Sequence, residues 1–141
     1  MMRYVVVDTN VVIAGLLTKD PSSPTAIIFE GMMDGEILYV LSPELLAEYR
    51  AVLLRPKLVA LHGLSEQEID EFLTHLTANA VWCEPSTQGI APDSNDNHLW
   101  AVMDERPDTL LITGDRLLLE KPHTEGGVVR PIEYVSRFKR G

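Results

Sequence analysis

The chain has almost no cysteine and no long apolar run, and both absences exclude classes of protein. Cys83 is the single cysteine among 141 residues, so no internal disulfide can form, and no metal-ligand spacing surrounds it that would suggest a zinc cluster. No apolar stretch approaches the roughly 18 to 20 residues of a membrane span. The first residues also lack the basic region and the cleavage site of a secretory signal. We therefore expect a cytoplasmic protein without a membrane segment.

Basic residues are also scarce. Twelve Lys and Arg residues stand against 21 Asp and Glu residues, which gives a formal net charge of -9. Such a charge disfavours broad electrostatic adhesion to nucleic acid. Any contact with a phosphate backbone would therefore need a local basic patch.

The composition is otherwise that of one globular domain, which we expect to span residues 1–141. Hydrophobic residues make up 45% of the chain. A chain of this length buries roughly two thirds of the surface that it exposes when unfolded. Its core should therefore need no disulfide or structural metal for stability.

The first motif is the stretch from Tyr4 to Leu17, which reads YVVVDTNVVIAGLL. Its three consecutive valines lead into Asp8, and an apolar run without alternation predicts a strand buried on both faces, as in a parallel sheet covered by helices. Such sheets bind ligands at the carboxyl ends of their strands, where Asp8 would lie. The alternative is that Asp8 or Thr9 only caps the following helix.

The rest of the chain alternates between strand and helix patterns in the same way. We predict strands at 37–41, 81–83, 109–113 and 128–129, and helices that begin near residues 25, 43, 65, 94, 117 and 131, the last reaching Phe138. A loop rich in proline and serine should separate the first two helices. The alternation predicts an α/β fold around a mainly parallel sheet.

Glu48 occupies an unusual position in the helix that begins at Pro43. On a helical wheel it lies at the margin of the apolar stripe, whereas Glu44 faces away. A solvated flank position is the alternative for Glu48, so this residue becomes a candidate only together with others.

Asp96 gives a stronger signal. It precedes Leu99, Trp100 and Met103 at spacings of three, four and seven residues, so a carboxylate should occupy the buried face of a helix. A buried carboxylate is costly unless it is paired, hydrogen-bonded or bound to a metal. Asp93 or Ser94 is a suitable cap for this helix, and the pattern favours a functional role for Asp96.

The strand predicted at 109–113 ends in the same manner as the first. Gly114 allows a tight exit from the strand, and Asp115 follows directly. If the two strands are parallel, Asp115 reaches the same edge of the sheet as Asp8. The sequence thus predicts several carboxylates at one edge.

Four segments, VVVDTN, LSPELLAEYRAVLLRPK, PDSNDNHLWAV and LLITGD, together resemble the PIN-domain ribonucleases, especially the toxin components of bacterial toxin-antitoxin pairs. They occur in the family's order and cover most of the chain. The resemblance implies a three-layer α/β/α sandwich and metal-dependent cleavage of RNA. Carried over position by position, the acidic cluster would be Asp8, Glu48, Asp96 and Asp115, with Asp93 as an outer member and Asn10 and Thr113 as supporting polar groups.

The resemblance also implies partners. They are a small antitoxin protein and a second copy of the chain in a homodimer. The apolar stripe of the second helix, formed by Ile28, Phe29, Met32 and Met33, belongs either to the core or to such a subunit interface.

The chemistry of the four acidic residues supports the same interpretation. Converging carboxylates repel one another unless a cation neutralises them, and oxygen ligands without His or Cys favour Mg²⁺ or Mn²⁺. Such an ion can polarise a phosphoryl oxygen and activate water for hydrolysis of a phosphodiester. We expect Asp8 and Asp96 to be direct ligands, Asp115 a ligand directly or through water, and Glu48 a ligand or the group that orients the attacking water. The candidates for the phosphate backbone, by location only, are Arg50, Arg55, Lys57, Arg116 and the basic tail with Arg137, Lys139 and Arg140.

Three other classes of protein also place acidic residues at strand ends. A haloacid-dehalogenase-like phosphatase would carry a second Asp two residues after Asp8, where this chain has Asn10. A receiver-like signalling module would need a lysine after a late strand, and Gly114 and Asp115 offer none. A catalytically silent PIN-like binding module would have lost its acidic residues, whereas all four are present.

Overall fold

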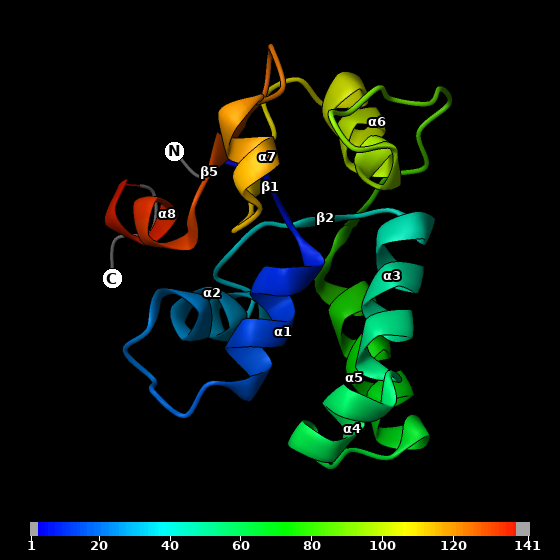
Figure 1. Cartoon of the computed structure of the whole chain (residues 1–141), viewed down its shortest axis with the longest axis vertical. Coiled ribbons are helices and arrows are strands. Elements are labelled where there is room, and N and C mark those ends of the chain that lie inside the picture. The colour runs from blue at the N-terminus through cyan, green and yellow to red at the C-terminus, as the bar shows by residue number, and fades with distance from the viewer. Residues whose placement is uncertain (1–2, 138–141) are drawn as a thin grey trace.

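The computed structural model describes residues 3–137 as short strands alternating with helices (Figure 1). The strands are β1 (Val5–Val7), β2 (Val40–Leu41), β3 (Val81–Trp82), β4 (Leu110–Ile112) and β5 (Gly127–Val129). The helices are α1 (Thr9–Leu17), α2 (Pro24–Met33), α3 (Pro43–Leu53), α4 (Pro56–His62), α5 (Glu66–Asn79), α6 (Asn97–Glu105), α7 (Arg116–Glu120) and α8 (Pro131–Arg137), and a 3-10 turn at Ser94–Asp96 leads into α6.

The sheet is parallel throughout, as predicted. One part has the strand order β1-β4-β5, and the other consists of β2 and β3. A parallel bridge between Val5 and Tyr39 joins the two parts. All strands therefore end at the same edge, so the residues that follow β1 and β4 lie side by side.

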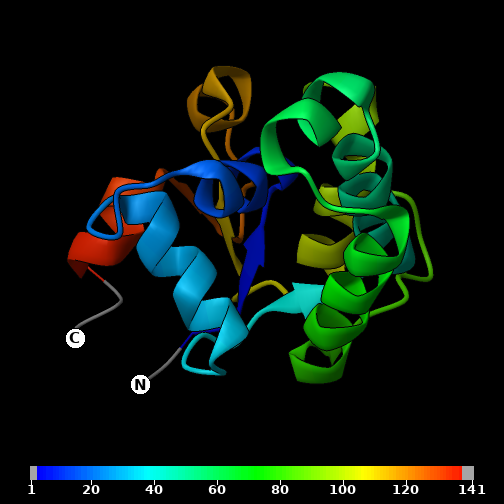
Figure 2. The same ribbon diagram turned by 90° about the horizontal axis from the view of Figure 1, so that it is seen from below.

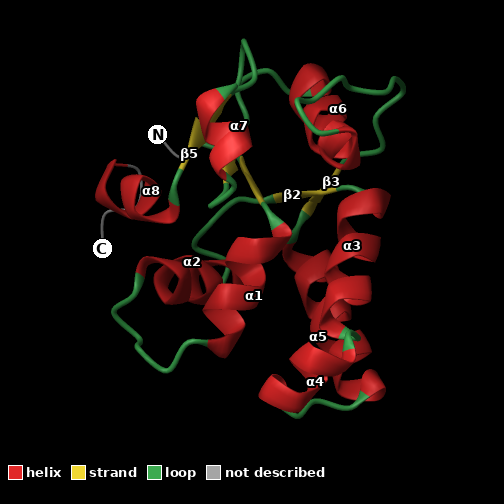
Figure 3. Ribbon diagram, viewed as in Figure 1, coloured by secondary structure: helices red, strands yellow, loops and turns green. Residues whose placement is uncertain are grey.

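Helices cover both faces of this sheet. Figure 2 shows β1 between α2 and α8 on one side and α3, α5 and α6 on the other. The residues of β1 and β4 are at most 1% exposed, because helices pack on both faces. Figure 3 shows how little of the chain is strand, and the α/β sandwich predicted from the sequence is confirmed.

Two of the helix starts follow directly from the sequence. Ser42 accepts a hydrogen bond from the backbone N–H of Leu45 at 3.1 Å and thereby fixes the start of α3. Ser65 and Glu68 form a capping box at the start of α5. The start of α3 matters most, because this helix carries Glu48.

The segment between β3 and α6 is held closely against α6. A Cβ atom on Gly89 would lie 2.4 Å from the backbone nitrogen of Ala101, so only glycine fits there. The side chain of Asn97 accepts a hydrogen bond from the backbone N–H of Ala91 at 2.8 Å, and Ser86 donates to Glu105 at 2.7 Å. The segment is therefore fixed to α6 at several points.

Some element predictions need correction. The strand expected at 37–41 is confined to Val40–Leu41, with Tyr39 contributing only a bridge. The last helix reaches Arg137 in the part of the chain that the structure describes, and Phe138 lies outside it. Among residues 3–137, no helix combines the length and the apolar character needed to cross a membrane.

The apolar stripe of α2 is not a free surface. Ile28 and Met32 are fully buried within the chain, and Phe29 stacks on Phe72 of α5 with ring centroids 5.7 Å apart. Met33 is only partly buried and packs against the same core. Ile28 and Met32 therefore belong to the core, with α1, α5 and α8 packed against α2, and a subunit interface stays a prediction for the partly exposed Phe29 and Met33 only.

Candidate active site

The ends of β1 and β4 bring two of the predicted carboxylates together. The hydroxyl of Thr113 donates a hydrogen bond to Oδ2 of Asp8 at 2.7 Å. The same hydroxyl oxygen accepts from the backbone N–H of Asp115 at 3.0 Å. Thr113 thus connects the two acidic residues through its hydroxyl group.

Asp8 and Asp115 also act as helix caps. Oδ1 of Asp8 accepts from the backbone N–H of Thr9 at 2.8 Å, and Oδ1 of Asp115 accepts from that of Leu117 at 2.9 Å. The two interpretations of a strand-end aspartate, cap and site residue, are therefore compatible. Each carboxylate uses one oxygen atom to cap its helix, and each also lines a cleft.

Glu48 reaches the same place from α3. Its Oε2 atom accepts a hydrogen bond from the hydroxyl of Thr9. The next residue, Tyr49, donates its hydroxyl hydrogen to the backbone carbonyl of Val7 and so fixes α3 against β1. These two contacts hold Glu48 beside Asp8.

Asp96 lies at the start of α6 and approaches from a third side. It occupies the cap position of that helix, but its side chain makes no capping hydrogen bond. It is half-buried, so the prediction that it lies on the buried helix face is wrong in detail. The reason is that α6 begins at Asn97, which leaves Asp96 at the boundary, where its carboxylate faces the cleft.

These carboxylates line one open cleft of about 520 Å³. The residues around it are Asp8, Thr9, Asn10, Ile13, Ala14, Leu17, Glu48, Val52, Arg55, Asp96 and Asp115. Oδ1 of Asn10 is 3.4 Å from the backbone nitrogen of Gly114, from which it accepts a hydrogen bond. Asp93 does not line the cleft, because its carboxylate caps the 3-10 turn by accepting from Asn95.

Burial and mutual repulsion shift the protonation of this cluster. The pKa of Asp96 is raised to about 6, first by burial and then by the charges of Asp8, Asp115, Asp93 and Glu48. Burial likewise raises the pKa of Asp8, although its hydrogen bonds oppose the shift. The carboxylates are therefore close enough to sense one another's charge.

The pKa of Glu48 is shifted in the opposite direction. The neighbouring His98 holds the pKa of Glu48 below its usual value, and the hydroxyl of Thr9 and the charge of Arg55 act in the same sense. The site thus contains one carboxylate that stays ionised and another that takes up a proton more easily, which is a common arrangement in active sites.

His98 is the site residue that the sequence analysis missed. Its Nε2 atom lies 3.6 Å from Oε1 of Glu48, and its side chain is 15% exposed. The residues that line the cleft include no histidine, but His98 lies at the border of the cleft beside Glu48. The sequence did place His98 near the site, because it follows Asp96 by two residues in the first turn of α6. It did not show that His98 faces Glu48, which is distant in the sequence.

Two of the candidate basic residues are already paired with carboxylates. Arg50 binds Asp70, with Nε and Oδ1 2.8 Å apart, and Arg116 binds Glu120 at 2.9 Å. Lys57 does not line the cleft, whereas Arg55 does. The tail residues Lys139 and Arg140 lie outside the described residues.

The oxygen-only lining of the cleft has the donor chemistry that Mg²⁺ and Mn²⁺ prefer. Within residues 3–137, no three His, Cys, Asp or Glu side chains are grouped so as to hold a metal ion as they stand. Ionised carboxylates without a counter-ion repel one another, and this repulsion adds to the effect of burial in raising the pKa of Asp96. The donor set therefore fits a hard divalent ion in its chemistry.

Comparison with known proteins gives one family. The family model for the PIN domain matches residues 4–117, which contain β1, β4 and all four carboxylates of the cleft. A search of curated proteins finds no match. PIN domains are generally nucleases and typically use divalent metal ions, so neither the phosphatase nor the receiver interpretation is needed. The match spans more than half of the chain, and the chain therefore belongs to the PIN-domain family.

Proposed function

We propose that the protein is a metal-dependent endoribonuclease that hydrolyses RNA phosphodiester bonds. The observation that carries this proposal is the cleft at the carboxyl edge of the sheet, where Asp8, Glu48, Asp96 and Asp115 face one another from four different segments. Such a cluster in a PIN-domain nuclease fold suits a divalent cation and a phosphate group, and no other described cleft gathers as many acidic residues.

Asp8, Asp96 and Asp115, with Glu48, would hold Mg²⁺ or Mn²⁺. When bound, the ion supplies Lewis-acid polarisation of the phosphoryl group and lowers the proton affinity of water. Glu48 is the residue best suited to orient the attacking water, because its pKa is lowered and it stays ionised. Thr9 and Thr113 keep the carboxylates in place through their hydroxyl groups.

The cleft has a second half that suits the rest of a nucleotide. Ile13, Ala14, Leu17 and Val52 form an apolar wall beside the carboxylates. Such a wall can pack against the face of a base or sugar, and contacts of this kind do not depend on sequence. Arg55 lies at the same cleft and can bind a neighbouring phosphate.

The direct test is cleavage of single-stranded RNA by the purified protein with Mn²⁺, Mg²⁺ or a chelator. We expect cleavage with metal and none with chelator, and a single-stranded DNA of the same sequence shows whether the activity is confined to RNA. An equal rate in the chelator would contradict the metal-dependent mechanism. Metal binding without any cleavage of either nucleic acid would favour the catalytically silent binding module.

Arg55 should contribute to substrate binding more than any other basic residue of this face. We expect Arg55→Gln to raise KM with little change in kcat, because the guanidinium would bind a phosphate next to the scissile one. For single-stranded RNA, loss of one phosphate contact should reduce the slope of log(kcat/KM) against log salt concentration by about 0.7.

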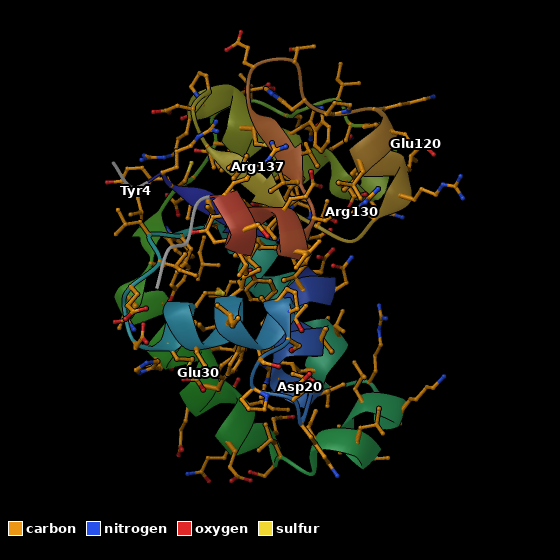
Figure 4. The ribbon with its side chains drawn as sticks, turned by 90° about the vertical axis from the view of Figure 1, so that its left-hand side faces the viewer. Tyr4, Asp20, Glu30, Glu120, Arg130 and Arg137 are labelled. Atoms are coloured by element: carbon orange, nitrogen blue, oxygen red, sulfur yellow. The ribbon has the colours of Figure 1, made fainter. Side chains whose placement is uncertain are left out.

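Arg137→Gln is the matched control for this experiment. Figure 4 shows Arg137 on α8, at the side of the molecule formed by α2 and α8, and it does not line the cleft. If Arg137→Gln reduced the slope of log(kcat/KM) against log salt concentration as much as Arg55→Gln, the proposal that RNA lies along the cleft would be wrong.

The toxin role is a separate proposal that rests on the resemblance of the sequence motifs to toxin components. It implies a small antitoxin protein and a homodimer, to whose interface only the partly exposed Phe29 and Met33 of the α2 stripe could contribute. Light scattering on the purified protein tests the dimer. Growth arrest on expression, relieved by Asp96→Asn or by the product of a neighbouring small gene, tests the toxin role.

A further inference from the structure

His98 lies at the meeting point of three elements that form the cleft. It belongs to the first turn of α6, it faces Glu48 of α3 at 3.6 Å, and Glu48 in turn is hydrogen-bonded to Thr9 of α1. The ring also borders a second, smaller hollow of about 360 Å³, which lies beside the segment with Gly89. His98 therefore separates the acidic cleft from its neighbour.

The two ring nitrogens of His98 are buried, and neither has a hydrogen-bond partner within residues 3–137. Buried polar atoms without partners are costly and uncommon, so such a group calls for an explanation. The Oε1 atom of Glu48 lies 3.6 Å from Nε2, slightly beyond hydrogen-bond distance. A small rotation of either side chain would close this contact and give Nε2 a partner.

We propose that His98 is the positioning residue of the acidic cleft, which holds the Glu48 carboxylate between its Nε2 atom and the hydroxyl of Thr9. The expected effect on activity rests on the proposed nuclease function, whereas the contact between His98 and Glu48 does not depend on that function. Thr9 is hydrogen-bonded to one oxygen of Glu48, and His98 faces the other at 3.6 Å, so closing the second contact would restrain rotation of the carboxylate. Groups that orient a catalytic carboxylate typically change activity or metal affinity by 10 to 100-fold when they are removed.

The test uses two substitutions of His98. The amide nitrogen of glutamine occupies about the place of Nε2, so His98→Gln should keep most of the activity. His98→Leu removes the donor, and we expect it to lower kcat by 10 to 100-fold with KM within about twofold. If His98→Leu does not fold, His98→Asn replaces it, because the shorter amide cannot reach Glu48. His75→Leu is the control, since His75 is exposed on α5 and bonds only to Asn79 and to the carbonyl of Met33.

A double-mutant cycle with Glu48→Gln separates positioning from a merely structural role. If His98 acts through Glu48, then His98→Leu should have little further effect on kcat in the Glu48→Gln background. Additive losses of activity, or a His98→Gln variant as damaged as His98→Leu, would overturn the proposal.

The same cycle can be measured on thermal unfolding of the metal-free protein, without any substrate. Coupling between His98 and Glu48 in stability establishes the contact even if the wild type does not cleave RNA. In that case the proposed function fails and the contact stands. Full additivity in the unfolding cycle would refute the contact itself, whatever the activity.

Discussion

Replacement of Asp96 by asparagine should abolish metal-dependent RNA cleavage and leave the fold intact. The substitution removes one charge from the cleft without changing the size of the side chain. Asp96 makes no capping hydrogen bond, so the variant loses no structural contact of that kind. We expect a fall in kcat on the order of a thousandfold, comparable to the loss of a preorganised electrostatic group in other enzymes.

Asp108→Asn is the matched control for this variant. Asp108 is exposed and lies just before β4, at the opposite edge of the sheet from Asp115. Glu44, which faces away from the acidic cleft, is less suitable because it lines the smaller hollow together with His98. Normal cleavage by Asp96→Asn, in a preparation free of contaminating nuclease, would refute the assignment of Asp96.

The second prediction with a large expected effect concerns the stability of the folded protein, and it can be tested without a substrate. A metal ion at about a hundred times its dissociation constant should stabilise the folded protein by roughly 2.7 kcal/mol, because the unfolded chain has no assembled site. For a domain of this size, the melting temperature should rise by several degrees. Thermal melts with chelator, Mg²⁺ and Mn²⁺ measure the effect, and identical melts in all three would show that the carboxylates do not bind metal.

The pH dependence of the metal-free protein follows from the same cluster. The folded-state pKa of Asp96, about 6, lies above its ordinary value of 3.8, so folding favours the protonated carboxyl group. This contribution to stability is complete below pH 3.8 and is lost as the pH rises through about 6. At neutral pH, Asp96→Asn should therefore raise the melting temperature in chelator by a few degrees and weaken the response to Mn²⁺.

Asp8→Asn is a less clean variant for the same purpose. Both oxygens of Asp8 accept hydrogen bonds, from Thr9 and from Thr113. In asparagine, an NH₂ group would replace one of these two accepting oxygens and would face a hydrogen-bond donor. The variant would therefore lose one hydrogen bond, which would offset the relief of charge repulsion. We therefore expect a smaller gain in melting temperature than for Asp96→Asn.

Local patterns predicted the part of the site that depends on strand ends. A buried valine run followed by Asp8, and an apolar strand followed by Gly114 and Asp115, are sufficient to place two carboxylates at one edge of a parallel sheet. No long-range information is needed, because parallel strands must end together.

The parts that sequence could not predict depend on how elements pack against one another. Helical periodicity identified the apolar stripe with Ile28 and Met32 but could not say that α1, α5 and α8 pack against this helix. His98 gave no signal for a similar reason, because its partner, Glu48, is 50 positions away on another helix. Asp96 lines the cleft, but the helix boundary was placed a few residues too early, and its role as a metal ligand stays a prediction.

The close contact at Gly89 has a consequence for engineering. The segment between β3 and α6 cannot move away from α6 without breaking backbone packing, so the two form one mechanical unit that carries both Asp96 and His98. A side chain larger than glycine at position 89 would therefore force the segment away from α6 and would displace Asp96 or His98 from outside the cleft, while the cleft itself stays open.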